Sequence, residues 1–191
     1  MIRSIVLLAL FPAVLAAQET YVGMQIGRNA VDLLHHGTRT GLAAGLFTEV
    51  DLNDHVGVGW EVTWLRSAVE EPLDPWNSRW PNTADPEYLT TDLVGRLSWR
   101  VPAPLPFDLA VGATVVGGGW LGYRTGGSYA DAALRRADFG HVWGVAFFAE
   151  RGRLKVEASA RSYHGEREVW DGGPTQRGSP AFIGVAYRIH S

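Results

Sequence analysis

The sequence predicts an all-β protein, an eight-stranded antiparallel up-and-down β-barrel whose strands cross a membrane. Three observations predict this fold. Bulky apolar residues alternate with small or polar ones along successive segments, the connections alternate between short and long, and the chain begins like an exported protein. The one plausible helix, Ala130 to Asp138, is short and lies in a connection.

Residues 1–17 predict a signal peptide. Arg3 gives a basic start, Ile5 to Leu15 form an apolar core, and Ala16 or Ala17 offers a small residue for cleavage. The apolar run is shorter than the roughly 20 residues that a membrane-spanning helix needs. We therefore expect an exported protein in which residues 18–191 form one barrel domain. The chain has no cysteine for a disulfide framework, and its formal net charge of −3 does not favour nucleic acid as a partner.

The hairpin from Gly41 to Trp64 shows the strand pattern most clearly. Even positions such as Leu46 and Val62 are bulky on both sides of its turn, whereas odd positions such as Gly45 and Glu61 are small or charged. The same period of two predicts eight strands along the chain. They are Tyr21–Asn29, Arg39–Leu52, Val56–Val69, Glu87–Val101, Phe107–Arg124, Arg136–Glu150, Leu154–Gly165 and Pro180–Ile189.

The connections between these strands fall into two length classes. Residues 53–55, 102–106 and 151–153 are short turns, whereas residues 30–38, 70–86, 125–135 and 166–179 are long loops. Because consecutive strands of an up-and-down barrel alternate in direction, all the short turns lie at one end and all the long loops at the other. Short periplasmic turns and long extracellular loops are typical of outer-membrane barrels.

Alternation alone fits two barrels whose faces are reversed. In a soluble lipocalin-like barrel the bulky residues fill the interior, whereas in a membrane barrel they face lipid and the polar residues line the lumen. The export signal and strands that reach the about 9 to 11 residues of a membrane crossing favour the membrane barrel. Aromatic residues near strand ends favour it too. They are Trp99, Phe107, Phe147 and Tyr187 at the short-turn end, with Trp64 and Phe139 toward the long loops.

Polar and charged residues of both signs share the lumen-facing parity. They are Gln25, Glu49, Glu61, Asp92, Arg96, Arg100, Asp108, Lys155, Glu157, Arg161 and Arg188. A barrel of about eight strands has an interior just wide enough for side chains. We therefore expect a lumen plugged by ion pairs rather than an open pore. The expected network consists of Glu49, Glu61, Asp92, Arg96, Glu157, Arg161 and Arg188.

Three quoted segments carry a family resemblance: the first strand "YVGMQIGRN", the hairpin "GLAAGLFTEVDLNDHVGVGWEVTW" and the last strand "AFIGVAYRI". Together with the export signal they resemble small outer-membrane β-barrel proteins of Gram-negative bacteria, in the OmpA/OmpX-like and PorT-like grouping. The resemblance implies the cell outer membrane as location, with outer-membrane lipid and lipopolysaccharide around the barrel. It also implies the barrel assembly machinery as a partner during biogenesis, although the chain ends in His190 and Ser191 rather than in an aromatic residue.

Ser162, His164 and Glu166 suggest an alternative function. Ser162 and His164 are two residues apart on one strand, and by parity both face outward, with Glu166 just beyond them. Some barrels that resemble this chain are lipid A-modifying hydrolases with a Ser-His-acid set toward the outer leaflet, but their histidine precedes the serine. The alternative is thus a lipid A hydrolase with Ser162 as nucleophile and His164 as base. The main expectation is a protein that is not an enzyme.

The loop from Glu70 to Glu87 departs most from what a barrel requires. Its four prolines restrict the backbone, and its tryptophans are costly in free water. We expect either an aromatic platform for an extracellular glycan or protein, or rings that fold back onto the barrel mouth or the lipid headgroups. The candidate binding residues are Trp76, Arg79 and Trp80, with Tyr129 and Trp170 from neighbouring loops.

Other motif-like patterns do not indicate a cofactor or a metal. Gly117, Gly119 and Gly122 match G-x-G-x-x-G, but they lie inside a strand pattern rather than at a strand-to-helix turn. His35 and His36 are adjacent, without the spacing of metal ligands. The sequence therefore predicts an outer-membrane barrel with a structural or surface-interaction role in adhesion or binding. A soluble exported lipocalin-like carrier of a small apolar ligand is a second alternative.

Overall fold

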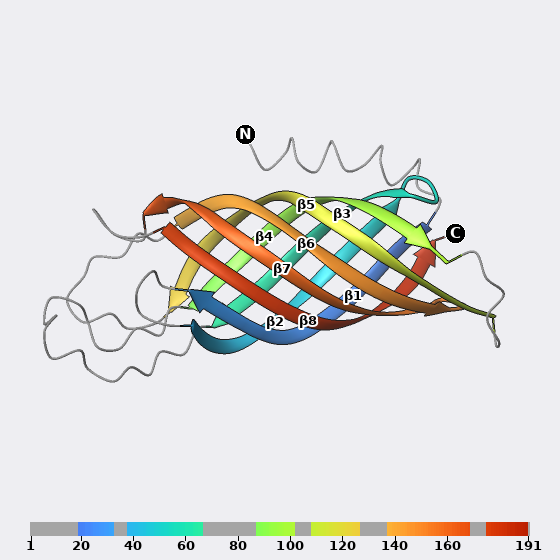
Figure 1. The fold of residues 1–191 in the computed structure, drawn as a ribbon, viewed down its shortest axis with the longest axis horizontal. Helices are drawn as coiled ribbons and strands as arrows, with labels where there is room; N and C mark the ends of the chain where they lie inside the picture. Colours follow the sequence, from blue (N-terminus) through green and yellow to red (C-terminus); the bar gives the residue numbers. More distant parts are fainter. Residues whose placement is uncertain are drawn as a thin grey trace, which may run out of the picture.

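Eight long strands make up almost all of the residues that the structure describes (Figure 1). The computed structural model describes residues 19–32, 38–66, 87–101, 108–126, 137–168 and 175–190. The strands are β1 (Glu19–Asp32), β2 (Thr38–Asp51), β3 (Val56–Arg66), β4 (Glu87–Arg100), β5 (Leu109–Gly126), β6 (Ala137–Arg151), β7 (Leu154–Glu168) and β8 (Thr175–His190).

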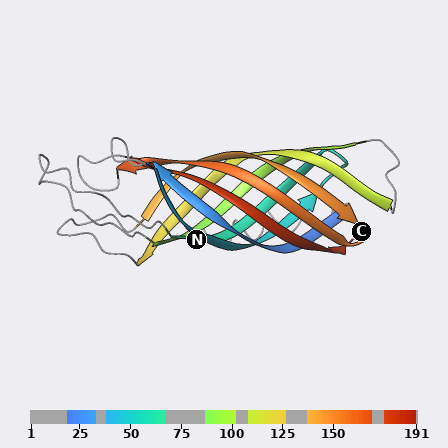
Figure 2. The same ribbon diagram turned by 60° about the horizontal axis from the view of Figure 1, so that its bottom comes forward.

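The strands form one closed barrel in sequence order. Each strand pairs antiparallel with the next, and β8 pairs antiparallel with β1, so that the sheet has no free edge. All eight strands run obliquely to the long axis, as the two views in Figures 1 and 2 show. Closure satisfies the backbone hydrogen bonds of every strand within the sheet, a requirement for any β-structure in a bilayer.

The predicted fold class is confirmed, with local differences at strand ends. Each of the eight predicted strands overlaps one observed strand. The predicted helix from Ala130 lies mostly outside the described residues, and its last two residues, Ala137 and Asp138, belong to β6 instead. Asp108 does not face the lumen as expected. It precedes β5, is exposed, and adopts a φ of 53°, a left-handed conformation that aspartate tolerates in turns.

Side chains alternate between the two faces of the barrel wall along most of each strand. On β4, β5 and β6, buried and exposed positions follow each other with a period of two over most of the strand. The outward positions carry large apolar side chains, and Met24, Leu46 and Phe147 are each about two-thirds exposed, at 66%, 65% and 66%. The inward positions carry most of the charged residues of the described strands. This distribution is opposite to that of a soluble barrel, in which the apolar side chains fill the interior.

Two short connections are defined at one end of the barrel. In the turn between β2 and β3, the Asn53 side-chain oxygen accepts hydrogen bonds from the backbone amides of His55 and Val56, at 2.9 and 2.8 Å. This side chain takes the place of a backbone acceptor in the turn. Between β6 and β7 the chain reverses through Gly152, whose φ of +60° suits a residue without a Cβ.

The predicted signal peptide and part or all of each predicted long loop lie outside the described residues, as do Phe107, His35 and His36. Residues 30–32, 38, 125–126, 166–168 and 175–179 were expected in loops but belong to β1, β2, β5, β7 and β8. Among the residues that are described, no helix is long and apolar enough to cross a membrane.

Candidate functional site in the lumen and on the outer face

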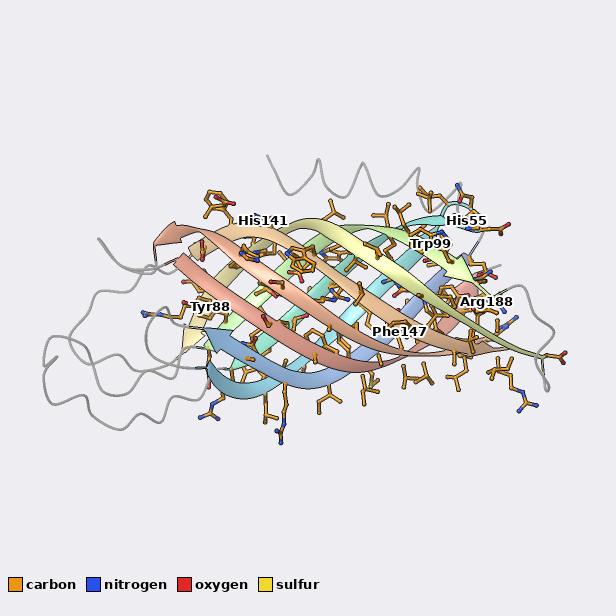
Figure 3. The ribbon with its side chains drawn as sticks, in the orientation of Figure 1. His55, Tyr88, Trp99, His141, Phe147 and Arg188 are labelled. Carbon is orange, nitrogen blue, oxygen red and sulfur yellow. The ribbon has the colours of Figure 1, made fainter. Side chains whose placement is uncertain are left out.

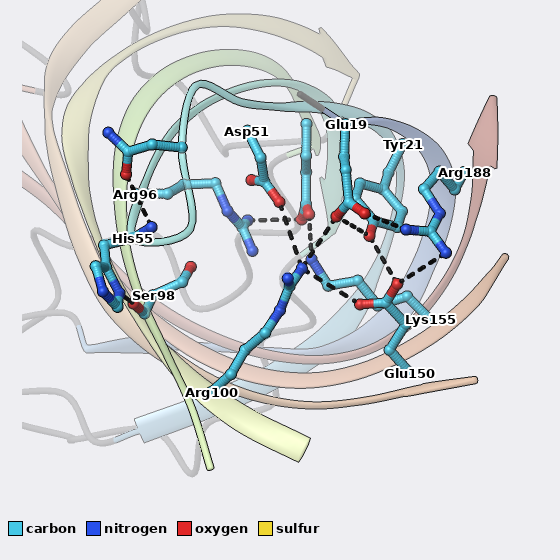
Figure 4. Close-up of polar contacts among 12 residues, drawn as sticks. Glu19, Tyr21, Asp51, His55, Arg96, Ser98, Arg100, Glu150, Lys155 and Arg188 are labelled. Atoms are coloured by element: carbon cyan, nitrogen blue, oxygen red, sulfur yellow. Dashed lines mark hydrogen bonds and ion pairs between the residues drawn. The ribbon is translucent and has the colours of Figure 1, made fainter. Parts of the chain in front are cut away.

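The inward-facing charges meet in three layers, the first of which lies at the end with the short turns. This mouth cluster consists of Glu19, Tyr21, Arg100, Glu150 and Arg188 (Figure 4). Arg100 Nη2 lies 3.0 Å from Glu19 Oε2 and 3.5 Å from Glu150 Oε2. Arg188 forms an ion pair with Glu19 and lies 3.6 Å from Glu150. The Tyr21 hydroxyl is 2.8 Å from both carboxylates, so the cluster joins β1, β4, β6 and β8 across the opening.

The second layer, the central cluster, consists of Glu49, Arg96, Lys155 and Glu157, and all four side chains are almost fully buried. Arg96 Nη1 lies 2.7 Å from Glu49 Oε1, and its Nη2 donates to Glu157 Oε2 at 2.9 Å. Lys155 forms an ion pair with Glu49 and lies 3.8 Å from Glu157. Two cations therefore hold two carboxylates, and the contacts connect β2, β4 and β7, which are not neighbours in the wall.

The third layer lies further from the short turns. Arg161 Nη1 lies 2.5 Å from Glu61 Oε2, which also accepts a hydrogen bond from Gln25 Nε2 at 3.1 Å. Beside it, the Tyr163 hydroxyl donates to the buried carboxylate of Asp92. Each of these contacts again links strands that are not neighbours in the wall: β7 reaches β3 through Arg161 and β4 through Tyr163, and β1 reaches β3 through Gln25.

The structure brings most of the expected network residues together, although not in one network. Glu49, Arg96 and Glu157 meet in the central cluster, and Glu61 pairs with Arg161 in the third layer. Arg188 belongs to the mouth cluster with Arg100, whose side chain is 38% exposed. Asp92 contacts Tyr163 rather than a cation.

Aromatic rings fill the lumen between the charges, and they were not among the predicted lumen residues. Tyr21 and Phe47 pack with Ala186, and Trp120 meets Tyr163 edge-to-face with ring centroids 5.8 Å apart. The alternation along the strands could have indicated that these rings face the lumen, because each occupies an inward position. Glycines opposite the rings make this packing possible: a Cβ at Gly23 would lie 2.4 Å from Phe47 Cζ, and one at Gly112 would lie 2.4 Å from Phe148 Cζ.

Four polar side chains gather on the outer face of β6 and β7, and we call them the outer polar cluster: His141, Ser162, His164 and Glu166. Ser162 Oγ lies 3.0 Å from His164 Nε2, within hydrogen-bond reach. Glu166 does not complete the expected triad with His164. Its Oε1 instead accepts a hydrogen bond from His141 Nδ1 at 3.0 Å, and the two imidazoles stack with centroids 5.0 Å apart. The cluster is thus a serine-histidine pair beside a histidine-glutamate pair. His141 was missed because its approach depends on the register of β6 and β7.

The predicted loop residues Trp76, Arg79, Trp80, Tyr129 and Trp170 lie outside the described residues. Within the described strands, no group of three or more histidine, cysteine, aspartate or glutamate side chains is arranged to hold a metal ion.

A closed eight-stranded meander, apolar outside and charged inside, defines the class of small outer-membrane-type β-barrels. Solved members of this class are similar to the chain in fold. OprG of Pseudomonas aeruginosa matches 92% of this chain and 98% of its own, with a TM-score of 0.55 and 11% identity. Neisserial surface protein A matches 88% of this chain and 96% of its own, with a TM-score of 0.52 and 10% identity.

A third similar structure is Ail, the attachment invasion locus protein of Yersinia pestis, solved in complex with the heparin analogue sucrose octasulfate. It matches 90% of this chain and 98% of its own, with a TM-score of 0.50 and 12% identity. At such identities the likeness concerns the fold alone, and it confirms the predicted resemblance at that level. No family model and no curated protein matches the chain.

Proposed function

We propose that this protein is an outer-membrane β-barrel with a structural or surface-interaction role and a lumen closed by ion-paired side chains. The observation that carries the proposal is the reversed distribution of side chains. Leu46 and Phe147 point outward and are mostly exposed, whereas Glu49 and Arg96 point inward and are buried. A bilayer solvates the apolar outer wall, and the ion pairs satisfy the charges inside.

The lumen contacts support a plug rather than a pore. Cross-lumen ion pairs occur in all three layers, and the rings of Tyr21, Phe47, Trp120 and Tyr163 occupy space between them. Outer-membrane lipid and lipopolysaccharide surround such a barrel, and the barrel assembly machinery inserts it. The outward Tyr187 and Ile189 near the end of β8 suit that C-terminal recognition, since both are at least half exposed.

Cell fractionation combined with gel mobility tests the placement. A closed barrel keeps its backbone hydrogen bonds in mild detergent, so the unheated protein should migrate differently from the boiled protein and should sediment with outer membranes. Recovery in the soluble periplasmic fraction, with the same mobility before and after boiling, would contradict the proposal. That result would favour the exported lipocalin-like carrier instead.

A surface-interaction role is the finer part of the proposal and concerns the loops. Trp76 and Trp80, with Arg79 between them and Tyr129 and Trp170 in other loops, provide rings and a cation that suit a sulfated or acidic glycan. Ail, which is similar in fold, was solved with a sulfated sugar. Binding of the purified protein to a heparin column should fall in the Trp76→Ala, Trp80→Ala double variant. It should persist in Trp99→Ala, which removes an exposed tryptophan near the opposite end (Figure 3).

A hydrolase of outer-leaflet lipid is a second candidate, and the contact between Ser162 and His164 favours it. At 3.0 Å, His164 Nε2 can take the hydroxyl proton of Ser162. The acid that orients the base in a triad is absent from its expected place, because Glu166 contacts His141. If the pair is catalytic, expression should remove an acyl chain from lipid A, and Ser162→Ala should abolish that change in mass spectra. Unchanged lipid A would leave the non-enzymatic role.

A further inference from the structure

The outer polar cluster interrupts an otherwise apolar stretch of the outer wall. Along β6 the outward side chains on either side of His141 are Phe139 and Trp143, exposed by 44% and 56%. On β7 the outward positions nearer the short turn are alanines and Val156. The cluster places two imidazoles, a hydroxyl and a carboxylate on a lipid-facing wall. Such polar groups need polar partners, which a bilayer supplies only at its headgroups.

Next to the cluster, several outward-facing positions of the wall are glycines, which have no side chain. Gly95 and Gly117 are directly opposite each other on β4 and β5, and Gly117 and Gly119 pair in turn with Trp143 and His141 on β6. A Cβ on Gly117 would meet no atom within 4 Å, and one on Gly119 would come no closer than 3.7 Å to any atom. These three glycines form what we call the glycine window, a flat patch bordered by the exposed ring of Trp143.

The hydrogen bonds within the cluster leave one edge of each imidazole open. Glu166 accepts from His141 Nδ1, and Ser162 contacts His164 Nε2. Among the described residues, His141 Nε2 and His164 Nδ1 have no hydrogen-bond partner, and the two rings are parallel within 3°. A ring N–H at an open nitrogen can donate a charge-assisted hydrogen bond to a phosphate oxygen.

The position of the outer polar cluster along the barrel indicates which leaflet of the membrane surrounds it. His141 lies toward the end opposite the short turns, whereas His55, Trp99 and Arg188 lie toward the short-turn end (Figure 3). In outer-membrane barrels the short turns are periplasmic, so His141 lies on the outer-leaflet side. A phosphate with attached acyl chains on that side belongs to lipopolysaccharide.

We propose that the outer polar cluster and the glycine window bind one lipopolysaccharide molecule. A lipid A phosphate contacts His141 and His164, and an acyl chain lies flat over Gly117 and Gly119 beside Trp143. This inference rests on the proposed outer-membrane placement, and it names the site for the lipopolysaccharide partner.

Native mass spectrometry in detergent tests the site with two probes, deep-rough lipopolysaccharide and phosphatidylglycerol. We expect one bound lipopolysaccharide per barrel, at an affinity about tenfold lower in His141→Gln, His164→Gln, since two charge-assisted contacts are lost. Gly117→Leu should weaken binding similarly by filling the window, and the space around it predicts an intact barrel. Ala44→Leu, which adds the same bulk to an exposed outward position on β2, is the control and should bind like wild type.

Enzymatically dephosphorylated lipopolysaccharide provides a test that requires no variant. The wild-type barrel should bind it about tenfold more weakly than the phosphorylated form. Equal binding of the two forms, equal binding by all variants, or preferential binding of phosphatidylglycerol would overturn the site. Each sample is also checked for heat-modifiable mobility, so a failure of the membrane placement is distinguished from a failure of the lipid site.

Discussion

Replacing Arg96 by alanine provides the sharpest test of the plugged lumen. Within the described strands, Arg96 is the only residue that lies under 3 Å from both Glu49 and Glu157, and its side chain is 1% exposed. Removing one partner of a buried ion pair costs about 3 to 5 kcal/mol. Lys155 still pairs with Glu49 and lies 3.8 Å from Glu157, so we expect the lower value. A loss of about 3 kcal/mol corresponds to a change of roughly 100-fold in the unfolding equilibrium.

Reversible urea unfolding in detergent micelles, followed by tryptophan fluorescence, measures this loss. Arg66→Ala is the matched control, because Arg66 Nε lies 3.7 Å from Glu87 and the two side chains are 46% and 31% exposed. An exposed pair is worth under about 1 kcal/mol. A double-mutant cycle between Arg96→Ala and Glu49→Ala should give a coupling free energy of about 1 kcal/mol or more.

The reasoning fails if Arg96→Ala and Arg66→Ala are equally mild. A difference in unfolding free energy of less than about 1 kcal/mol between the Arg96 variant and wild type would mean that water screens the central cluster. The lumen would then be a hydrated channel lined by charges, and the proposed plug would be wrong.

Three further expectations follow from the lumen. Gly23→Ala should destabilise the barrel by about 1 to 3 kcal/mol, because its Cβ would lie 2.4 Å from Phe47 Cζ and 2.6 Å from a backbone oxygen. Gly117→Ala, where a Cβ meets no atom within 4 Å, should not destabilise it, and equal effects of the two substitutions would refute the packing explanation. Tyr163→Phe removes a buried donor to Asp92 and should cost about 1 to 3 kcal/mol in the same urea titration, and an unchanged midpoint would contradict this. The wild-type barrel in a planar bilayer should pass no steady ion current, and regular conductance steps would show an open pore.

The fold was predictable because the two faces of a barrel strand meet different environments, so residues suited to each environment alternate along the sequence. Between Val56 and Arg66 one face meets the lumen and the other lies outside, so parity indicates both the strand and its orientation. Strand ends were less predictable. Asp108 continues the polar parity of the expected strand, yet the chain there adopts a left-handed conformation before β5 begins.

Parity also indicates which charges face inward, but it does not indicate which charges meet. Arg96 and Glu157 are 61 residues apart on strands that are not neighbours, and their contact depends on the stagger of the closed sheet. The same limit applies outside the barrel. Glu166 was assigned to His164 by closeness in sequence, whereas the register of β6 and β7 brings His141 to it.

The lumen charges are distributed unevenly along the chain. Glu61 on β3 has its cation, Arg161, on β7, and Glu49 on β2 has only one of its two cations, Arg96 on β4, among the early strands, because the other, Lys155, is on β7. A half-built sheet of early strands therefore carries Glu61 without its counter-charge, at a cost of several kcal/mol for an ion taken into a bilayer. The first strands consequently gain nothing by entering the membrane ahead of β7. Insertion and ring closure should occur as one cooperative event, in which the late strand neutralises the early ones.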